Sequence, residues 1–275
     1  MLESLLALGA GLIIGSFLNV CIYRLPRDLS VAQPARSYCP GCEHPIAWYD
    51  NIPLLSYLVL RGRCRHCRQR IPWRYPIVEC LTALLFFLCV HPLGLTLLAA
   101  KYCLLCALLV GLVFADLEER ILPDEFTLGG TLAGLILAWF VPVDDVIAHA
   151  LLSMANVDWQ PRVMSFAESL AGALVPTFFL WFGGYIYEKI RHKEGLGLGD
   201  VKMMAMIGAF LGLRASLLTL IAASVLGSIM GLLYILITRK DASSYELPFG
   251  TFLGAAGIVV ALLGQRVIGW YAAQF

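Results

Sequence analysis

The sequence predicts an all-α polytopic membrane protein, and its composition is the first reason. Of its 275 residues, 60% are hydrophobic and 14% are charged, and the mean hydropathy is +0.79. Ordinary soluble domains are about 45–50% apolar and about 25% charged. The formal net charge of only +1 argues against a chain that binds nucleic acid through net positive charge. The excess of apolar side chains is therefore expected to face lipid.

The arrangement of the apolar residues in long runs is the second reason. A helix needs roughly 20 mostly apolar residues to cross a bilayer. Apolar runs separated by charged residues, proline or glycine predict about eight transmembrane helices. They cover residues 2–23, 77–91, 94–115, 126–141, 167–188, 201–213, 216–237 and 249–271. The runs at 77–91 and 201–213 are short, so a re-entrant segment remains an alternative for each.

The distribution of basic residues predicts the orientation. The first span has no basic residue before it and is followed by Arg24 and Arg27, so we expect an uncleaved anchor with the N-terminus outside. The cytoplasmic segments are then 24–76, 116–125, 189–200 and 238–248. Together with Lys202 they hold sixteen of the 20 Lys and Arg residues, as the positive-inside rule requires. Outside, the connection 142–166 is expected to contain a short amphipathic helix on the membrane.

The loop from Arg24 to Pro76 contains two cysteine knuckles. They are Cys39-Pro-Gly-Cys42 and Cys64-Arg-His-Cys67, separated by 21 residues. This spacing is typical of a tetrahedral zinc site with four thiolates. Two disulfides or free thiols are the alternative, which a reducing cytoplasm disfavours. The zinc is expected to hold the fold of a loop that has little core of its own.

Other candidate metal ligands have plainer interpretations. His44 and His66 lie beside the knuckles as spare candidate ligands. Cys103-Leu-Leu-Cys106 has knuckle spacing but falls inside a predicted span, where a small polarizable side chain at a helix contact is expected.

Two aspartates stand out because each adjoins an apolar run. Asp116 directly follows the run 108–115, and Asp200 ends the glycine-rich segment 195–199 before the next span begins. The predicted orientation puts both at the cytoplasmic face. An ionisable group at that depth is costly unless it is paired or faces water, which favours a functional role. The alternative is structural, with Asp200 as a helix N-cap and Asp116 as a solvated helix end.

If the two carboxylates meet, their chemistry follows from a shared proton. Two carboxylates within reach of one water do not both ionise easily. One then acts as general base on the water while the other, protonated, donates to the scissile carbonyl, as in aspartic proteases. The glycines before Asp200 allow the backbone to leave helical geometry and an extended substrate to approach.

Two smaller features have structural interpretations. Asp124 follows Pro123 and precedes an apolar span, so we expect it to be a helix N-cap. Gly11-x-x-x-Gly15 is expected to pack the first span against another helix of the same chain.

These residues carry a resemblance to a known family. The segment from Asp116 to Asp124 (DLEERILPD), followed far downstream by Gly197-Leu-Gly-Asp200-Val-Lys202, resembles the paired motifs of the type IV prepilin peptidases, the G-x-G-D class of intramembrane aspartyl proteases. Three further stretches match, namely residues 15–26, the double knuckle and Leu247-Pro-Phe-Gly250. The matches run in order from about residue 10 to 257.

The resemblance implies an activity and its residues. Asp116 and Asp200 take the catalytic roles, and Asp124 has none. Such enzymes cut the short basic leader from prepilins and from pseudopilins of type II secretion, on the cytoplasmic side of the bacterial inner membrane. Many then methylate the new N-terminal amine with S-adenosylmethionine, an activity associated with the first loop. The loop holds no nucleoside-binding signature, so we assign no methyl-donor residues.

The expected organisation has three parts. Residues 1–23 form the first transmembrane helix, 24–76 a zinc-binding loop associated with N-methylation, and 77–275 a seven-helix aspartyl peptidase core.

Two other classes of protein are alternatives. A proton-coupled transporter would use the same aspartates to relay protons. It predicts carboxylates near the middle of the membrane and repeated halves, whereas both aspartates fall at one face and the sequence shows no repeat. A zinc-ribbon adaptor with a membrane anchor needs only one or two spans.

Overall fold

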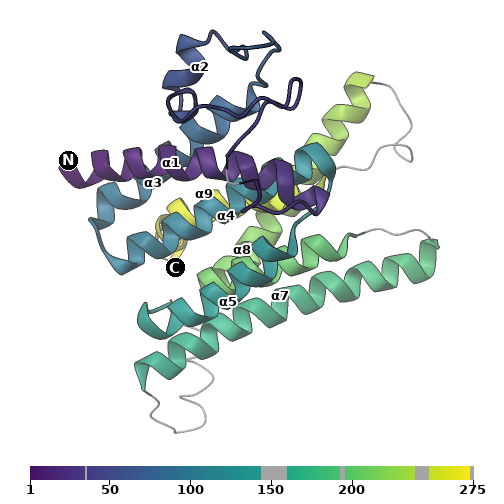
Figure 1. Cartoon of the computed structure of the whole chain (residues 1–275). Coiled ribbons are helices and arrows are strands. Elements are labelled where there is room, and N and C mark those ends of the chain that lie inside the picture. Colours follow the sequence, from purple (N-terminus) through teal and green to yellow (C-terminus); the bar gives the residue numbers. More distant parts are fainter. Residues whose placement is uncertain (35, 144–159, 193–195, 239–247, 273–275) are drawn as a thin grey trace, which may run out of the picture. The chain divides into compact units, whose positions relative to one another are not determined.

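The computed structural model describes the chain except for residues 35, 144–159, 193–195, 239–247 and 273–275 (Figure 1). Its α-helices are α1 (Leu2–Arg24), α2 (Leu55–Val59), α3 (Arg74–Leu93), α4 (Leu97–Glu119), α5 (Asp124–Phe140), α7 (Pro161–Arg191), α8 (Leu198–Thr238) and α9 (Phe249–Ala272). Two short 3-10 helices, Leu25–Arg27 and Trp48–Asn51, lie in the loop after α1. The described residues contain isolated β-bridges but no strand, which confirms the all-α prediction. The expected amphipathic helix falls largely on 144–159 and lies outside the described residues.

Among the described residues, five helices are long and apolar enough to cross a membrane. They are α1, α3, α4, α7 and α8, and α9 adds a shorter apolar stretch at Phe249–Gly264. Each of the eight predicted runs falls on a helix, two of them on α8. Large apolar side chains such as Ile13, Leu132 and Phe179 are more than half exposed on these helices, as lipid-facing residues are. The number of spans and their orientation stay predictions.

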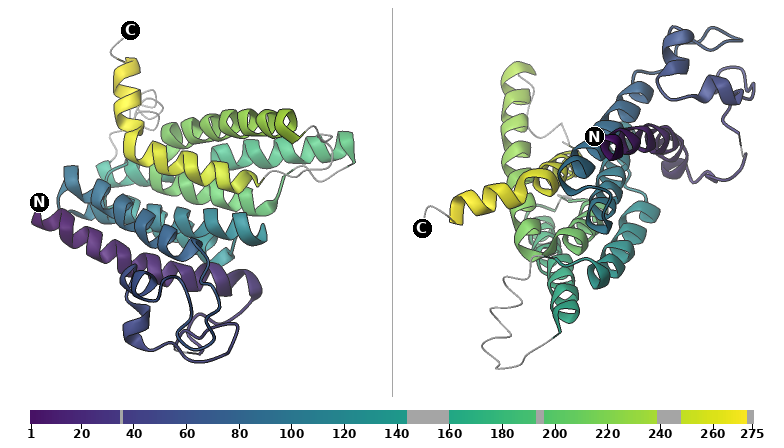
Figure 2. Two further views of the ribbon diagram at one scale, coloured as in Figure 1. Left: turned by 90° about the horizontal axis from the view of Figure 1, so that it is seen from above. Right: turned by 90° about the vertical axis from the view of Figure 1, so that its left-hand side faces the viewer.

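The chain forms two compact units, Met1–Gly111 and Leu112–Phe275. In the first, α1 and α3 lie side by side (Figures 1 and 2). A Cβ atom at Gly11 would lie 2.6 Å from Ala83 Cα, and one at Gly15 would lie 2.7 Å from Glu79 Cα. The two glycines therefore allow the backbones to touch, which confirms the predicted packing within the chain.

In the second unit, α7 packs along the first part of α8 (Figures 1 and 2). The Ser169 hydroxyl donates a hydrogen bond to Ala209 O at this contact. The first part of α8 is deeply buried, with Met203, Met204 and Met206 fully inaccessible. Because this segment begins close to Asp200, its dense packing fixes where that carboxylate lies.

The backbone of α8 leaves helical geometry at Gly212, where φ is 80°. Such a positive φ favours glycine. The helix resumes after the break, and the Leu213 N–H has no acceptor within its own helix. Glu168, which is 1% exposed, accepts that hydrogen bond at 3.1 Å. The break lies at the end of the predicted span 201–213, shortly before the predicted span 216–237.

Candidate active site and candidate metal centre

The second unit brings the two predicted catalytic aspartates together. Asp116 lies in the last turn of α4 and Asp200 in the first turn of α8, and they are 6% and 9% exposed. A Cβ atom at Gly250 would lie 2.9 Å from Asp200 Oδ1 and 3.1 Å from Asp116 Oδ2. The two oxygens are therefore within about 6 Å of each other, the sum of these distances. At such a separation the charges of the two carboxylates interact, so that one disfavours ionisation of the other.

A residue at the start of α9 binds the carboxylate of Asp116. Thr251 donates two hydrogen bonds to Asp116 Oδ2, from its backbone N at 2.7 Å and from its hydroxyl at 2.8 Å. First-turn N–H groups lack the usual acceptor four residues back, and the positive end of the helix dipole favours a carboxylate. Sequence reasoning missed Thr251. The adjacent Pro-Phe-Gly250 motif was the available signal.

The glycine-rich segment sets the approach to Asp200. The Asp200 backbone N donates to Gly197 O at 3.1 Å, which closes a turn as α8 begins. A Cβ atom at Gly199 would lie 3.0 Å from the Leu122 side chain, and one at Gly250 would lie 3.1 Å from its Cδ1. Leu122 therefore supplies an apolar wall beside both aspartates.

Asp124 does not occupy the predicted N-cap position. The N-cap residue of α5 is Pro123, and Asp124 is the first residue of the helix. No side chain makes a capping hydrogen bond at this helix start. Its carboxylate instead accepts hydrogen bonds from Lys202 Nζ at 2.7 and 2.9 Å, in an exposed ion pair. The N-cap prediction was wrong because the helix begins one residue earlier than predicted, at Asp124 itself, and a distant lysine binds the carboxylate.

The first unit assembles the predicted metal centre. The Sγ atoms of Cys39, Cys42, Cys64 and Cys67 all lie within 4.8 Å of one another, and those of Cys39 and Cys67 are 3.7 Å apart. Four sulfurs about 2.3 Å from a tetrahedral zinc are about 3.8 Å apart, so these thiols fit a metal ion. His44 and His66 are not in the cluster, and their rings contact each other at 3.6 Å.

The two knuckles share one local structure. The first-knuckle Cys39 N donates to His44 O, and the second-knuckle Cys64 N donates to Gln69 O. Each knuckle is followed by a residue with positive φ, Glu43 or Arg68. Hydrogen bonds from the backbone of Cys67 and of His66 lower the pKa of the Cys64 thiol to about 7. Cys64 thus favours the thiolate form that binds metal, whereas burial raises the pKa of the Cys39 thiol to about 11.

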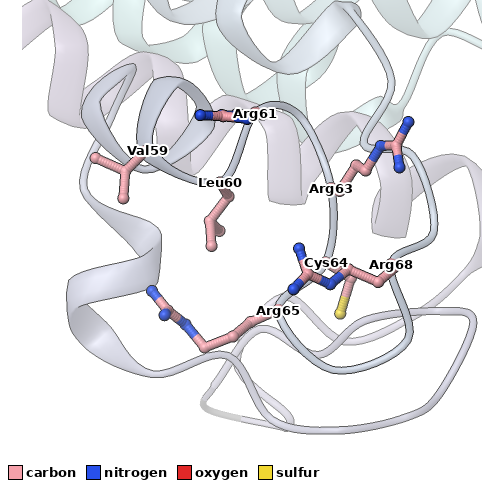
Figure 3. Close-up of a pocket in the computed structure, with 7 residues that line it drawn as sticks. All are labelled: Val59, Leu60, Arg61, Arg63, Cys64, Arg65 and Arg68. Carbon is pink, nitrogen blue, oxygen red and sulfur yellow. The ribbon is translucent and has the colours of Figure 1, made fainter.

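A cavity of about 530 Å³ lies beside Cys64 of the cysteine cluster (Figure 3). Its lining residues are Val59, Leu60, Arg61, Arg63, Cys64, Arg65 and Arg68. One of the four arginines, Arg65, is paired with Asp50 at 2.6 Å, and this pairing lowers the pKa of the Asp50 carboxyl. Arginine groups of this kind suit carboxylate or phosphate ligands. The sequence gives no sign of this cavity, because its lining residues carry no recognisable motif apart from Cys64.

Cys103 and Cys106 are explained by packing, as expected. Both are buried in α4. Cys106 Sγ lies 4.0 Å from Cys89 Sγ of α3, which is a contact between neighbouring helices.

Two buried carboxylates close to each other, on helices long and apolar enough for a bilayer, are the arrangement expected of an aspartic protease of the membrane-embedded class. Comparison with protein families agrees. Residues 10–93 match the Bacterial Peptidase A24 N-terminal domain, and residues 103–232 match the Type IV leader peptidase family. The chain belongs to the type IV leader peptidase family.

Relatives of the same name in three bacteria match most of the chain. A prepilin leader peptidase/N-methyltransferase of Aeromonas hydrophila is 39% identical, over 96% of this chain and 92% of its own length. One of Pseudomonas aeruginosa is 32% identical, over 95% and 90%. The protein of that name from Myxococcus xanthus is 43% identical over 86% of this chain, which spans 64% of the relative. No solved structure matches. These relatives give no support to the transporter alternative.

Proposed function

We propose that this chain removes the leader peptide from type IV prepilins or type II secretion pseudopilins and then methylates the new N-terminal amine. The observation that carries the proposal is the convergence of Asp116 and Asp200 on one point beside Gly250. The relatives, named prepilin leader peptidase/N-methyltransferase, support both halves of the activity.

The reaction needs one water and one proton shared by the pair. The ionised aspartate takes a proton from the water, whose oxygen attacks the scissile carbonyl carbon, while the protonated aspartate gives its proton to the carbonyl oxygen. A gem-diol forms. The C–N bond then breaks as the first aspartate returns its proton to the leaving nitrogen and the second takes one from a diol hydroxyl. The products are a carboxylic acid and an amine, and the pair regains its starting protonation.

The location belongs to the proposal as well. A leader on the cytoplasmic side meets the aspartates if the protein is a multi-pass protein of the bacterial inner membrane, surrounded by lipid, with its N-terminus outside. The basic residues gathered in the predicted cytoplasmic segments support this orientation.

Zinc and S-adenosylmethionine complete the proposal. Cys39, Cys42, Cys64 and Cys67 hold a zinc ion that stabilises the fold of the loop, since four thiolates leave no open coordination position. S-adenosylmethionine supplies the methyl group that the new amine accepts. No methyl-donor residues are assigned, although the cavity beside Cys64 has the size of a small-molecule site.

Substitution of each aspartate tests the catalytic pair. Asp116→Asn and Asp200→Asn each remove a proton-transfer group, so we expect each to lower leader cleavage at least a hundredfold while the protein still inserts in membranes. Asp124→Asn is the matched control, because that aspartate is 57% exposed and lies in an ion pair. Near-normal cleavage by either dyad variant would refute the pair.

Mass spectrometry of a prepilin incubated with the purified protein tests both activities at once. With S-adenosylmethionine, the mature chain should carry one methyl group, adding about 14 Da. Without it, the chain should be cleaved and unmethylated. Cleavage without the added methyl mass in either sample would support the peptidase activity and contradict the methyltransferase activity.

A further inference from the structure

Part of the loop between α1 and α3 lies beside these helices rather than beyond their ends. The Leu54 backbone N donates a hydrogen bond to Glu79 Oε2 of α3 at 2.8 Å. Glu79 lies against α1, since a Cβ atom at Gly15 would be 2.7 Å from Glu79 Cα. Gly15 is nine residues before the end of α1 at Arg24, which is about 13 Å along the helix axis. Figures 1 and 2 accordingly show α2, which directly follows Leu54, level with the middle of α1.

The start of α3 gives a second measure of this depth. Arg74 is the first residue of α3, and Glu79 lies five residues later, about 7 Å along the helix axis. Arg24 and Arg74 are charged residues at the predicted cytoplasmic ends of two neighbouring spans. Leu54 therefore meets α3 about 7–13 Å below these charges. Amphipathic helices that lie in a membrane interface are buried to about 5–10 Å.

At this depth α2 turns an apolar face away from the protein. Leu55, Leu58 and Val59 have the spacing of one helical face, and they are 54%, 73% and 66% exposed. Between them in sequence, Ser56 is buried, and its hydroxyl donates a hydrogen bond to Tyr49 O at 3.0 Å. Contact with acyl chains would remove the three exposed side chains from water, which is favourable.

Aromatic and basic side chains border this apolar face. The Trp73 ring, which is 73% exposed, lies beside the Tyr57 ring of α2, with centroids 5.7 Å apart. Tryptophan prefers the level of the lipid headgroups. Val59 lines the same cavity as Arg61 and Arg63 (Figure 3). Arginine binds phosphate groups, so one segment presents partners for both parts of an anionic phospholipid.

We propose that residues 54–63 are a membrane-contact site that enters the cytoplasmic leaflet beside α1 and α3. The apolar face of α2 contacts acyl chains, and Arg61 and Arg63 bind the headgroup phosphate of an anionic phospholipid. The loop is then held on the membrane surface and is not free in the cytoplasm. The inference rests on the proposed location, because α1 and α3 have to cross the bilayer, and it does not depend on leader cleavage.

Photo-crosslinking in lipid nanodiscs tests the contact with acyl chains. The purified full chain carries p-benzoylphenylalanine in place of Leu58, and mass spectrometry counts the lipid adducts formed on irradiation. Ile13, which is 66% exposed on α1, is the lipid-facing control position, and the exposed Asp28 is the aqueous one. Adducts at position 58 should be within threefold of those at 13 and at least tenfold above those at 28.

Two results of this experiment contradict the membrane contact. Lipid adducts at position 58 no more frequent than at position 28 would overturn it. Crosslinks from position 58 to a second copy of the chain in place of lipid would do the same, because the apolar face would then be a protein interface.

A double variant, Arg61→Gln with Arg63→Gln, tests the contact with the headgroup. Native mass spectrometry in detergent measures Kd for phosphatidylglycerol and for phosphatidylcholine. Kd for phosphatidylglycerol should rise at least fivefold in the variant, while Kd for phosphatidylcholine changes less than twofold. The matched control, Lys189→Gln with Arg191→Gln, also removes two exposed basic residues of the predicted cytoplasmic face and should keep the wild-type values.

Unchanged binding of phosphatidylglycerol in the loop variant, or an equal loss in the control, would overturn the role of the two arginines. Glycerol 3-phosphate separates a lipid from a soluble anion. If it binds the wild type with the same Kd as phosphatidylglycerol, the site takes a free phosphate compound and the lipid assignment is wrong.

The outcomes separate this inference from the proposed function. Both double variants should cleave the leader at the wild-type rate, because none of the four residues belongs to the catalytic pair. If position 13 also forms no lipid adducts, the proposed membrane location is wrong and the inference fails with it. If position 13 forms them and position 58 does not, only the membrane contact of α2 is wrong.

Discussion

Glu168 shows what a single buried carboxylate contributes within the second unit. It is 1% exposed, and its Oε1 accepts a hydrogen bond from the backbone N–H of Leu213, which directly follows the break in α8. Glu168→Ala would leave the Leu213 N–H without this acceptor and open a cavity, so we expect a loss of about 1–3 kcal/mol in the free energy of unfolding. Thermal unfolding in detergent measures this loss of stability.

Glu168→Gln is the control for that experiment. The amide retains an oxygen that accepts the hydrogen bond, so this variant should lose less stability than Glu168→Ala. Equal unfolding temperatures for the alanine variant and the wild type would show that the helix restart does not depend on this side chain.

The sequence reveals some of the site residues and hides others. Asp116 and Asp200 are recognisable because a charge beside an apolar run is costly and therefore conspicuous. Thr251 carries no such signal, since a threonine near a helix start is ordinary and its partner is 135 positions away. Asp124 was misjudged for the same reason. Its local context indicates a cap, and only the fold brings Lys202 within reach.

At the scale of elements, we expect the fold of the loop between α1 and α3 to depend on a metal ion held by its cysteine cluster. A variant with Cys39→Ser and Cys64→Ser loses two of the four thiolates, so purified protein should contain less than a tenth of the wild-type zinc by elemental analysis. N-methylation should fall with the fold of the loop, while leader cleavage should stay near the wild-type level. Cys80→Ser, which changes an exposed cysteine of α3, should keep the metal.

Retained zinc in the double variant would remove these cysteines from the metal site. Loss of cleavage together with methylation would contradict the view that the loop supports only the second activity.

The helices were predictable to a greater extent than the loop. Apolar runs of about 20 residues leave few alternatives in a bilayer, because every backbone group must be paired within the segment. The short helices α2 and Trp48–Asn51 have no such signal. They depend on distant contacts, such as the hydrogen bond from Leu54 N to the buried Glu79 Oε2 at 2.8 Å. Leu54 reaches this bond with φ at 60°, which its sequence context does not indicate.

At the scale of the whole molecule, the orientation in the membrane is a prediction from the distribution of basic residues. A membrane-impermeant maleimide should label Pro142→Cys in intact spheroplasts but not Asp28→Cys, because the basic loop is predicted to face the cytoplasm. Both variants should be labelled after permeabilisation, and the unmodified protein measures the background from native cysteines. Labelling of Asp28→Cys alone in intact spheroplasts would reverse the orientation.

The division of the chain into two compact units could not be predicted from the sequence either. Composition sets the loop 24–76 apart from its surroundings, whereas the contacts divide the chain at Gly111 and Leu112, inside α4. A helix that is continuous in sequence and in hydropathy offers no mark of such a boundary. The predicted division at residues 23 and 76 therefore stays a prediction.

The fully inaccessible Met203, Met204 and Met206 give the packing near Asp200 a chemical consequence. Peroxide converts methionine to its sulfoxide where it can reach the sulfur. In the folded protein these three thioethers are shielded, whereas Met1 is 83% exposed. Sulfoxide at the three positions, read from peptide masses, would therefore record how often α8 separates from its neighbours.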